Sequence, residues 1–197
     1  NTDTVLSSHI PWDISDITVS PDDNWLAFIL NEDGVKRFRL YNTKSGEIKK
    51  IDKLPLGNIV NFKFNPQKDN TLGFNLRLPS DQSNVDSYNI EKDELITWTS
   101  VEEISNYPDP EIIHYPTFDI DTITGRQREI TAYLHRPSRS FKAPFPVIIF
   151  IHGGPARQWG IERYRTWPFF LNEGIAYLAP NVRGSTGYGK TFTNLDN

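Results

Sequence analysis

Cysteine and methionine are both absent from this 197-residue sequence. Without cysteine, the chain can form no disulfide bond and offers no thiolate to a metal ion. Without methionine it has no initiator residue, so we expect a processed chain or a piece of a longer one. Long apolar runs are also missing, because the longest, from Val147 to Ile151, has five residues, against the roughly 18 of a membrane span. The first residues, Asn1 to Thr4, do not resemble a signal peptide.

The chain also lacks a strong excess of either charge. Its 21 Lys and Arg against 25 Asp and Glu give a net charge of −4. This balance gives no electrostatic reason to bind nucleic acid or an anionic membrane, and we expect neither partner. No spacing of His, Asp or Glu resembles a metal site, and no glycine-rich phosphate loop is present, so we predict no cofactor. The compartment stays unknown, since a cysteine-free chain fits any of them.

The first half of the sequence reads as short strands separated by turns. Strands are expected at 13–19, 25–30, 35–42 and 47–51, with a hairpin turn at Asp33-Gly34.

The pattern of the first four strands then repeats. Pro21 recurs as Pro66, an offset of 45, and Leu26 recurs as Leu72, an offset of 46. A period near 45 with four strands per unit is typical of β-propeller blades, although two unrelated meanders of a β-sandwich remain an alternative. Two blades cannot close a ring, so we expect further blades before Asn1.

Beyond Ser105 to Pro110, where two prolines break both helix and sheet, the pattern changes. We expect a hairpin of 112–119 and 128–136, a strand at 146–151 buried on both faces, a helix at 162–172 and a buried strand at 175–179. This order is typical of a parallel α/β sheet. We therefore divide the chain into two parts, residues 1–110 and 111–197.

A glycine-rich turn, His152-Gly153-Gly154-Pro155, follows the first buried strand. Glycine allows positive φ and a close approach of the backbone to a substrate. Acyl-transfer enzymes need N–H donors aimed at a developing oxyanion, and α/β-hydrolases take one from a loop of this kind. A tight turn without chemistry is the alternative.

A second motif follows the next strand: Pro180 to Gly189 reads Pro-Asn-Val-Arg-Gly-Ser-Thr-Gly-Tyr-Gly. Together, the two motifs resemble the prolyl oligopeptidase family of serine peptidases, closest to its acylaminoacyl-peptidase branch. That family places a β-propeller before an α/β-hydrolase domain. The resemblance implies that residues 1–110 are the C-terminal blades of a propeller and 111–197 the N-terminal part of the catalytic domain. It also implies hydrolysis of short peptides through an acyl-enzyme in the intact protein.

Carried over by position, the resemblance assigns the oxyanion N–H to Gly154 and the shaping of the loop to Gly153. The triad Ser, Asp and His are not in this chain, since no Gly-x-Ser-x-Gly occurs in it and the triad base comes late in this fold. We therefore predict that the chain alone is inactive. We also expect the rest of the hydrolase domain, or another copy of the chain, to cover the open edge of the strand at 175–179.

Other chemistry-bearing residues have simpler interpretations. We expect a structural role for His152, an ion pair within the hydrolase half for Arg183, and an ordinary loop position for Ser185. Glu102-Glu103 is similar to the paired acids that bind a free amine in dipeptidyl peptidases, but a solvated pair fits its position better. Aromatic residues around the predicted helix are expected to combine packing with a pocket rim: Trp159, Tyr164, Trp167, Phe169 and Phe170.

Two other functions stay open. One is an esterase or lipase, which uses the same fold and oxyanion loop. The other is a non-catalytic propeller that binds a partner.

Overall fold

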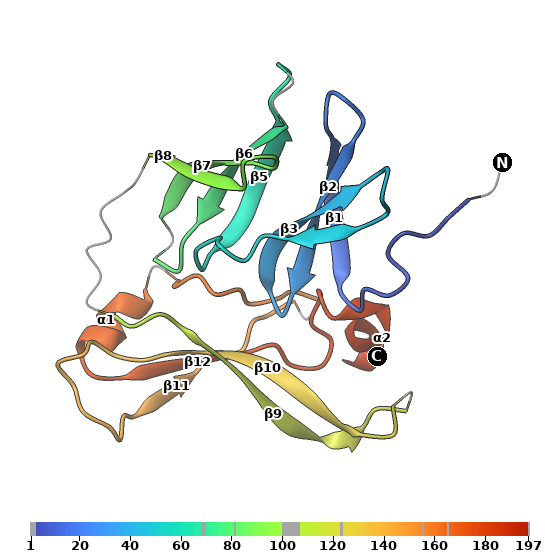
Figure 1. Ribbon diagram of the computed structural model, residues 1–197. Helices are drawn as coiled ribbons and strands as arrows, with labels where there is room; N and C mark the ends of the chain where they lie inside the picture. The colour runs from blue at the N-terminus through green and yellow to red at the C-terminus, as the bar shows by residue number, and fades with distance from the viewer. Residues whose placement is uncertain are drawn as a thin grey trace.

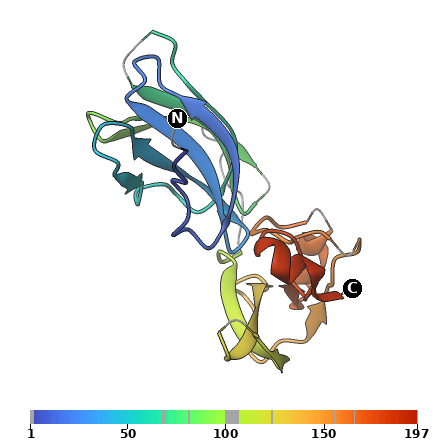
Figure 2. The same ribbon diagram turned by 90° about the vertical axis from the view of Figure 1, so that its right-hand side faces the viewer.

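The computed structural model describes residues 3–67, 70–80, 82–99, 107–122, 124–154, 156–164 and 166–196. Glu102, Glu103 and Pro155 lie outside these residues, so the interpretation of the acidic pair stays untested. Three four-stranded sheets account for the strands of the described part. Figures 1 and 2 both show the first two sheets on one side of the molecule and the third sheet on the other.

The first two sheets are antiparallel and follow the order of the chain. One contains β1 (Asp13–Val19), β2 (Trp25–Glu32), β3 (Val35–Asn42) and β4 (Ile48–Lys50). The other contains β5 (Asn58–Phe64), β6 (Thr71–Arg77), β7 (Ser83–Asn89) and β8 (Glu94–Thr99). The prediction of two separate four-stranded antiparallel sheets is therefore confirmed.

The sequence repeat is also a repeat of backbone geometry. The pairing of β1 with β2 shifts register between Ser15 and Ile17, and that of β5 with β6 shifts between Ile59 and Asn61. Each first strand therefore carries one extra residue near its middle, Asp16 in β1 and Val60 in β5, which increases the local twist of the strand. The predicted turn at Asp33-Gly34 has φ of 53° and 78°, the left-handed pair that a two-residue hairpin favours.

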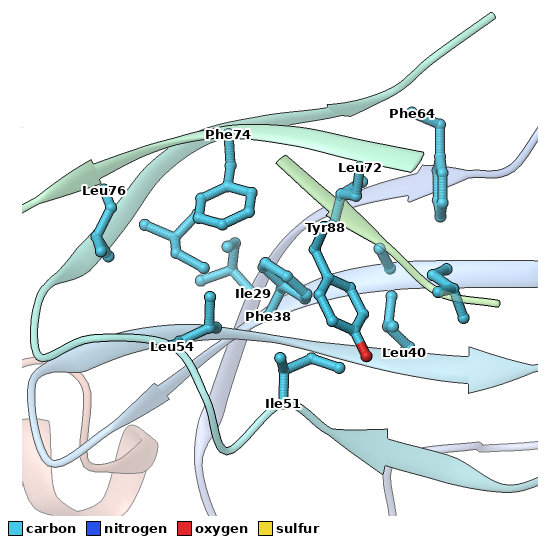
Figure 3. Close-up of a cluster of buried hydrophobic side chains, with 13 residues drawn as sticks. Ile29, Phe38, Leu40, Ile51, Leu54, Phe64, Leu72, Phe74, Leu76 and Tyr88 are labelled. Carbon is cyan, nitrogen blue, oxygen red and sulfur yellow. The ribbon is translucent and has the colours of Figure 1, made fainter. Parts of the chain in front are cut away.

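The two sheets share one apolar core (Figure 3). The ring centroids of Phe38 on β3 and Phe74 on β6 lie 5.3 Å apart in an edge-to-face arrangement, and Tyr88 on β7 packs beside Phe38. Such ring pairs add about 0.5–1.5 kcal/mol beyond the area that they bury. The buried members of this core are Ala27, Ile29, Phe38, Leu40, Ile51, Leu54, Ile59, Phe64, Leu72, Phe74, Leu76, Tyr88 and Ile90.

The third sheet has the strand order β11-β12-β10-β9. The predicted hairpin is formed by β9 (Glu111–Ile120) and β10 (Gln127–His135), and Gly125 in its turn has a φ of 68°. β11 (Val147–Ile149) and β12 (Ala176–Pro180) are parallel, with α1 (Trp167–Asn172) in the crossover between them. α2 (Gly189–Thr193) and a 3-10 turn (Asn194–Asp196) follow.

Three expectations for this half are corrected. The helix begins at Trp167 rather than at residue 162, because Pro168 has no N–H and is tolerated only in a first turn. β12 does not lack a neighbour, since it pairs with both β10 and β11. Among the described strands, the open edge next to β12 belongs to β11. This strand is also not buried on both faces, since Val147 is 50% exposed and Ile149 61%.

The tip of the β2–β3 hairpin joins the two halves. Val35 belongs to a second core with Tyr133 on β10, Ile161 and Trp167. The Tyr133 hydroxyl donates to the main-chain oxygen of Asp33. The first half of the chain therefore contributes directly to the packing of the third sheet.

Candidate functional site

The predicted oxyanion turn lies directly beyond the parallel strand β11. Gly153 and Gly154 are exposed, and Gly154 has a φ of 117°, outside the region that other residues adopt. Within the described residues, no backbone carbonyl accepts a hydrogen bond from the Gly154 N–H. The assignment of Gly154 and Gly153 to an oxyanion site stays a prediction.

The side chain of Arg157 packs against the turn. A Cβ atom added to Gly154 would lie 3.2 Å from Cγ and 3.4 Å from Cδ of Arg157. Two features of the structure therefore favour glycine at position 154: the positive φ and the close side chain of Arg157. The main-chain oxygen of Arg157 accepts the N–H of Thr186 at 3.0 Å, so the segment after the turn is tied to the second motif.

His152 and Ser185 join the two motifs through their side chains. His152 Nε2 lies 2.8 Å from Ser185 Oγ, and this hydroxyl donates to the Val182 carbonyl at 2.5 Å. Because the serine proton is already used, His152 Nε2 must carry the hydrogen and donate it. Burial also lowers the pKa of His152. Ser185 is fully buried, as expected for a loop serine and not for a nucleophile.

Asn181, which the sequence analysis did not single out, fixes the segment that covers the turn. Its side chain is fully buried at the end of β12. Oδ1 accepts the Trp159 N–H at 2.7 Å, while Nδ2 donates to the Trp159 oxygen at 3.1 Å and to Tyr188 Oη at 2.8 Å. A polar residue directly after a buried strand was the available signal for this role.

Arg183 has the structural role that the sequence predicts. Its Nη1 lies 3.6 Å from Asp119 Oδ2, and its guanidinium carbon lies 4.4 Å from the ring centroid of Phe118. The Thr117 hydroxyl, with Arg128 beside it, lowers the pKa of Asp119. Arg183 therefore pairs with β9 inside the second half.

The predicted aromatic cluster is partly core and partly rim. Trp167 is buried and stacks on Tyr177 with ring centroids 5.0 Å apart, while its centroid lies 5.5 Å from that of Trp159. Tyr164 and Phe169 are 55% and 68% exposed. Phe170 is half-buried and packs against the second core.

No complete Ser-His-Asp chain occurs among the residues that the structure describes. His9 is exposed, and His135 is buried, which lowers its pKa to about 3. His114 Nε2 lies 3.1 Å from Asp33 Oδ2, but the neighbouring hydroxyl, Thr131 Oγ1, donates to the aspartate at 2.7 Å and not to the histidine. The described part of the chain also brings together no three metal-ligating side chains of His, Asp or Glu.

A cavity of about 720 Å³ lies between the two halves, next to the oxyanion turn. Both halves line it: the first contributes Asp13, Ile14, Ser15, Asn31, Gly34, Lys36 and Asn58, and the second contributes Ala156, Arg157, Gln158, Gly160, Glu162, Thr186 and Gly187. Two hydrogen bonds of 2.8 Å cross between the halves at its wall, from Asn31 Nδ2 to Gln158 Oε1 and from Asn58 Nδ2 to Glu162 Oε1. The cavity wall therefore depends on both halves.

Comparison with known proteins supports the motif resemblance. The chain is 35% identical over 91 residues to dipeptidyl aminopeptidase BIII of Pseudoxanthomonas mexicana, covering 42% of this chain and 13% of that one. It is 31% identical over 105 residues to the acylamino-acid-releasing enzyme of Mus musculus, covering 50% and 14%. These partial matches agree with the resemblance of the chain to the prolyl oligopeptidase family of serine peptidases.

The fold of the chain is also similar to part of a solved structure. The chain superposes on the acylaminoacyl peptidase of Pyrococcus horikoshii with a TM-score of 0.67 at 21% identity, covering 95% of this chain and 28% of that one. The chain thus spans about an eighth of the length of the curated relatives it matches. No family model matches the chain. Among the described helices, none has the length and apolar character needed to cross a membrane.

Proposed function

We propose that this chain is part of a serine peptidase of the prolyl oligopeptidase family that hydrolyses short peptides in its intact form. The observation that carries the proposal is the exposed Gly153-Gly154 turn, with φ of 117° at Gly154, placed directly after a parallel strand. Residues 111–197 form the first strands of an α/β-hydrolase domain. Residues 1–110 form blades of a propeller.

The two repeated sheets support the propeller assignment. They have the same strand order, and each has a register shift near the middle of its first strand. They also pack together through one apolar core, as neighbouring blades do. The hairpin tip at Asp33 reaches the hydrolase half, so in this arrangement the last blades help to shape the site.

In the proposed reaction, a serine from beyond this chain attacks the peptide carbonyl while a histidine accepts the serine proton. Negative charge develops on the carbonyl oxygen, and the Gly154 N–H donates a hydrogen bond to it. Collapse of this intermediate breaks the C–N bond, and the histidine returns the proton to the leaving amine. Water then hydrolyses the acyl-enzyme by the same route.

The chain alone should hydrolyse nothing. Among the described residues, one Ser–His contact occurs, between Ser185 and His152, and in it the imidazole donates its hydrogen to the hydroxyl. A general base must instead accept the proton of the nucleophile.

A fluorophosphonate probe tests this assignment. We expect no labelling of the purified 197-residue chain and labelling of the longer protein that contains it. The longer protein should cleave aminoacyl-nitroanilides. Cleavage of nitrophenyl esters alone would favour an esterase, and labelling of the isolated chain with peptide turnover would refute its inactivity.

The substitution Gly154→Ala tests the oxyanion donor in the longer protein. At a φ of 117° alanine must shift the turn, and its Cβ meets Arg157 at 3.2 Å. Losing one oxyanion donor costs about 10²–10³ in kcat, and we expect a loss of that order. Gly125→Ala, also at positive φ but with no atom within 4 Å, is the matched control. Equal kcat values for the two variants would contradict the role of Gly154.

A further inference from the structure

The positively charged side chain of Arg157 lies between the predicted oxyanion turn and the cavity that both halves line. Arg157 lines the 720 Å³ cavity, and its side-chain carbons pack against Gly154. Arg157 is exposed, and no carboxylate within the described residues forms an ion pair with it. Its charge is therefore available to a ligand in the cavity.

The other charged side chains that line the cavity either form a hydrogen bond with the first half or belong to the first half. Glu162 Oε1 accepts a hydrogen bond from Asn58 Nδ2 at 2.8 Å, which holds this carboxylate against the first half. Asp13 and Lys36 belong to the first half and are exposed. Of the charged side chains that line the cavity, Arg157 is the one that contacts the glycine turn. In the proposed reaction, the Gly154 N–H of this turn polarises the substrate carbonyl.

We propose that Arg157 determines specificity by binding a carboxylate of the substrate close to the bond that is cleaved. The planar guanidinium matches a carboxylate through two parallel N–H···O bonds. Because Arg157 adjoins Gly154, the bound carboxylate belongs to the residue next to the scissile bond. It is either an acidic side chain or the terminal carboxylate of a very short peptide. This inference rests on the proposed peptidase function.

The longer protein that contains this chain allows a kinetic test. One pair of peptides differs only in Glu against Gln beside the cleaved bond, and a second pair only in a free carboxylate against a carboxamide at the C-terminus. A charge-assisted hydrogen bond corresponds to a factor of about 10 to 100 in kcat/KM. We expect Arg157→Gln to lower kcat/KM by that factor for the carboxylate member of one pair. The kcat/KM values for the neutral members should change by no more than about twofold.

Two further variants separate charge from folding. Arg157→Lys keeps a cation and should restore part of the preference, whereas Arg139→Gln removes an exposed arginine outside the cavity and should leave the preference intact. Thermal melting checks that each variant is folded. An equal effect of Arg157→Gln on all four peptides, or no effect on any, would overturn the inference.

A binding measurement distinguishes failure of the inference from failure of the proposed function. Isothermal titration with the uncleaved product peptides, acidic and amide, needs no turnover. A preference for the acidic peptide that Arg157→Gln abolishes supports the inference even if no peptide is hydrolysed. Peptide hydrolysis with no such preference, in binding or in kcat/KM, supports the proposed function and refutes the role of Arg157.

Discussion

Gly34 lies at a tight point of contact between the two halves. It has a φ of 78°, and a Cβ added to it would overlap the Tyr133 hydroxyl and lie 2.8 Å from the Trp159 oxygen. Both neighbours are held in place, because the Tyr133 hydroxyl donates to Asp33 O and the Trp159 oxygen accepts from Asn181. We predict that Gly34→Ala weakens the whole chain through this contact.

Two costs add in this variant. A left-handed conformation costs a residue with a Cβ about 1–2 kcal/mol. Forcing a methyl group into a packed contact costs about 1–3 kcal/mol more. The expected loss in the free energy of unfolding is therefore about 2–5 kcal/mol, measured by urea denaturation with tryptophan fluorescence. A loss of this size is a large fraction of the 5–15 kcal/mol that stabilises an ordinary domain.

Gly46→Ala is the matched control for Gly34→Ala. Gly46 has a φ of 76°, but its nearest neighbour, the Tyr41 hydroxyl, lies 3.8 Å from the added Cβ. This variant carries only the backbone cost of about 1–2 kcal/mol. In a Tyr133→Phe background the hydroxyl is gone, so Gly34→Ala should cost at least about 1 kcal/mol less than in the parent. Equal losses for Gly34→Ala and Gly46→Ala would refute the contact.

Three further predictions concern the second half. The buried His135 has a pKa of about 3 when folded and about 6.5 when unfolded, so the unfolded chain binds more protons between these values. Stability should therefore fall by about 2 kcal/mol from pH 7 to pH 5, and His135→Phe should abolish this fall in urea titrations. Asn181→Ala leaves the main-chain groups of Trp159 without these partners, and exchange of the Trp159 amide hydrogen should accelerate at least about tenfold. Ile149→Lys places a charge on the open edge of β11 and should reduce self-association in sedimentation velocity, whereas Val5→Lys, outside any strand, should not.

Local patterns were sufficient to predict most of the fold. Strands at 13–19 and 35–42 have the predicted bounds, because alternation and turn residues act within a few positions of one another. The Asp33-Gly34 turn follows for the same reason. The 45-residue repeat predicts two similar sheets, and the structure has a register shift near the middle of each first strand.

Errors occurred where a distant part of the chain decides the outcome. An apolar run at 146–151 fits both a central and an edge strand, and only the crossover that places β12 beside β10 puts β11 at the edge. The helix at 162–172 was predicted too long because its apolar spacing outweighed the effect of Pro168. The contacts of Asn181 and Arg157 depend on loops brought together by folding, so the position of Asn181 after a buried strand could single it out, but the sequence could not name the partners of either residue.

The boundary predicted after residue 110 rests on a change in sequence pattern, and apolar packing crosses it. Val35 and Leu56 from the first half pack in the core of the second. Gly34 in the hairpin lies close to the main-chain oxygen of Trp159, and Asn181 bonds to Trp159. Arg157, two residues before Trp159, packs against Gly154 and accepts the N–H of Thr186. We therefore expect a change in the hairpin to affect the segment that adjoins the candidate oxyanion donor. This coupling predicts that cutting the chain after residue 110 would expose apolar surface on both pieces and would not yield two stable domains.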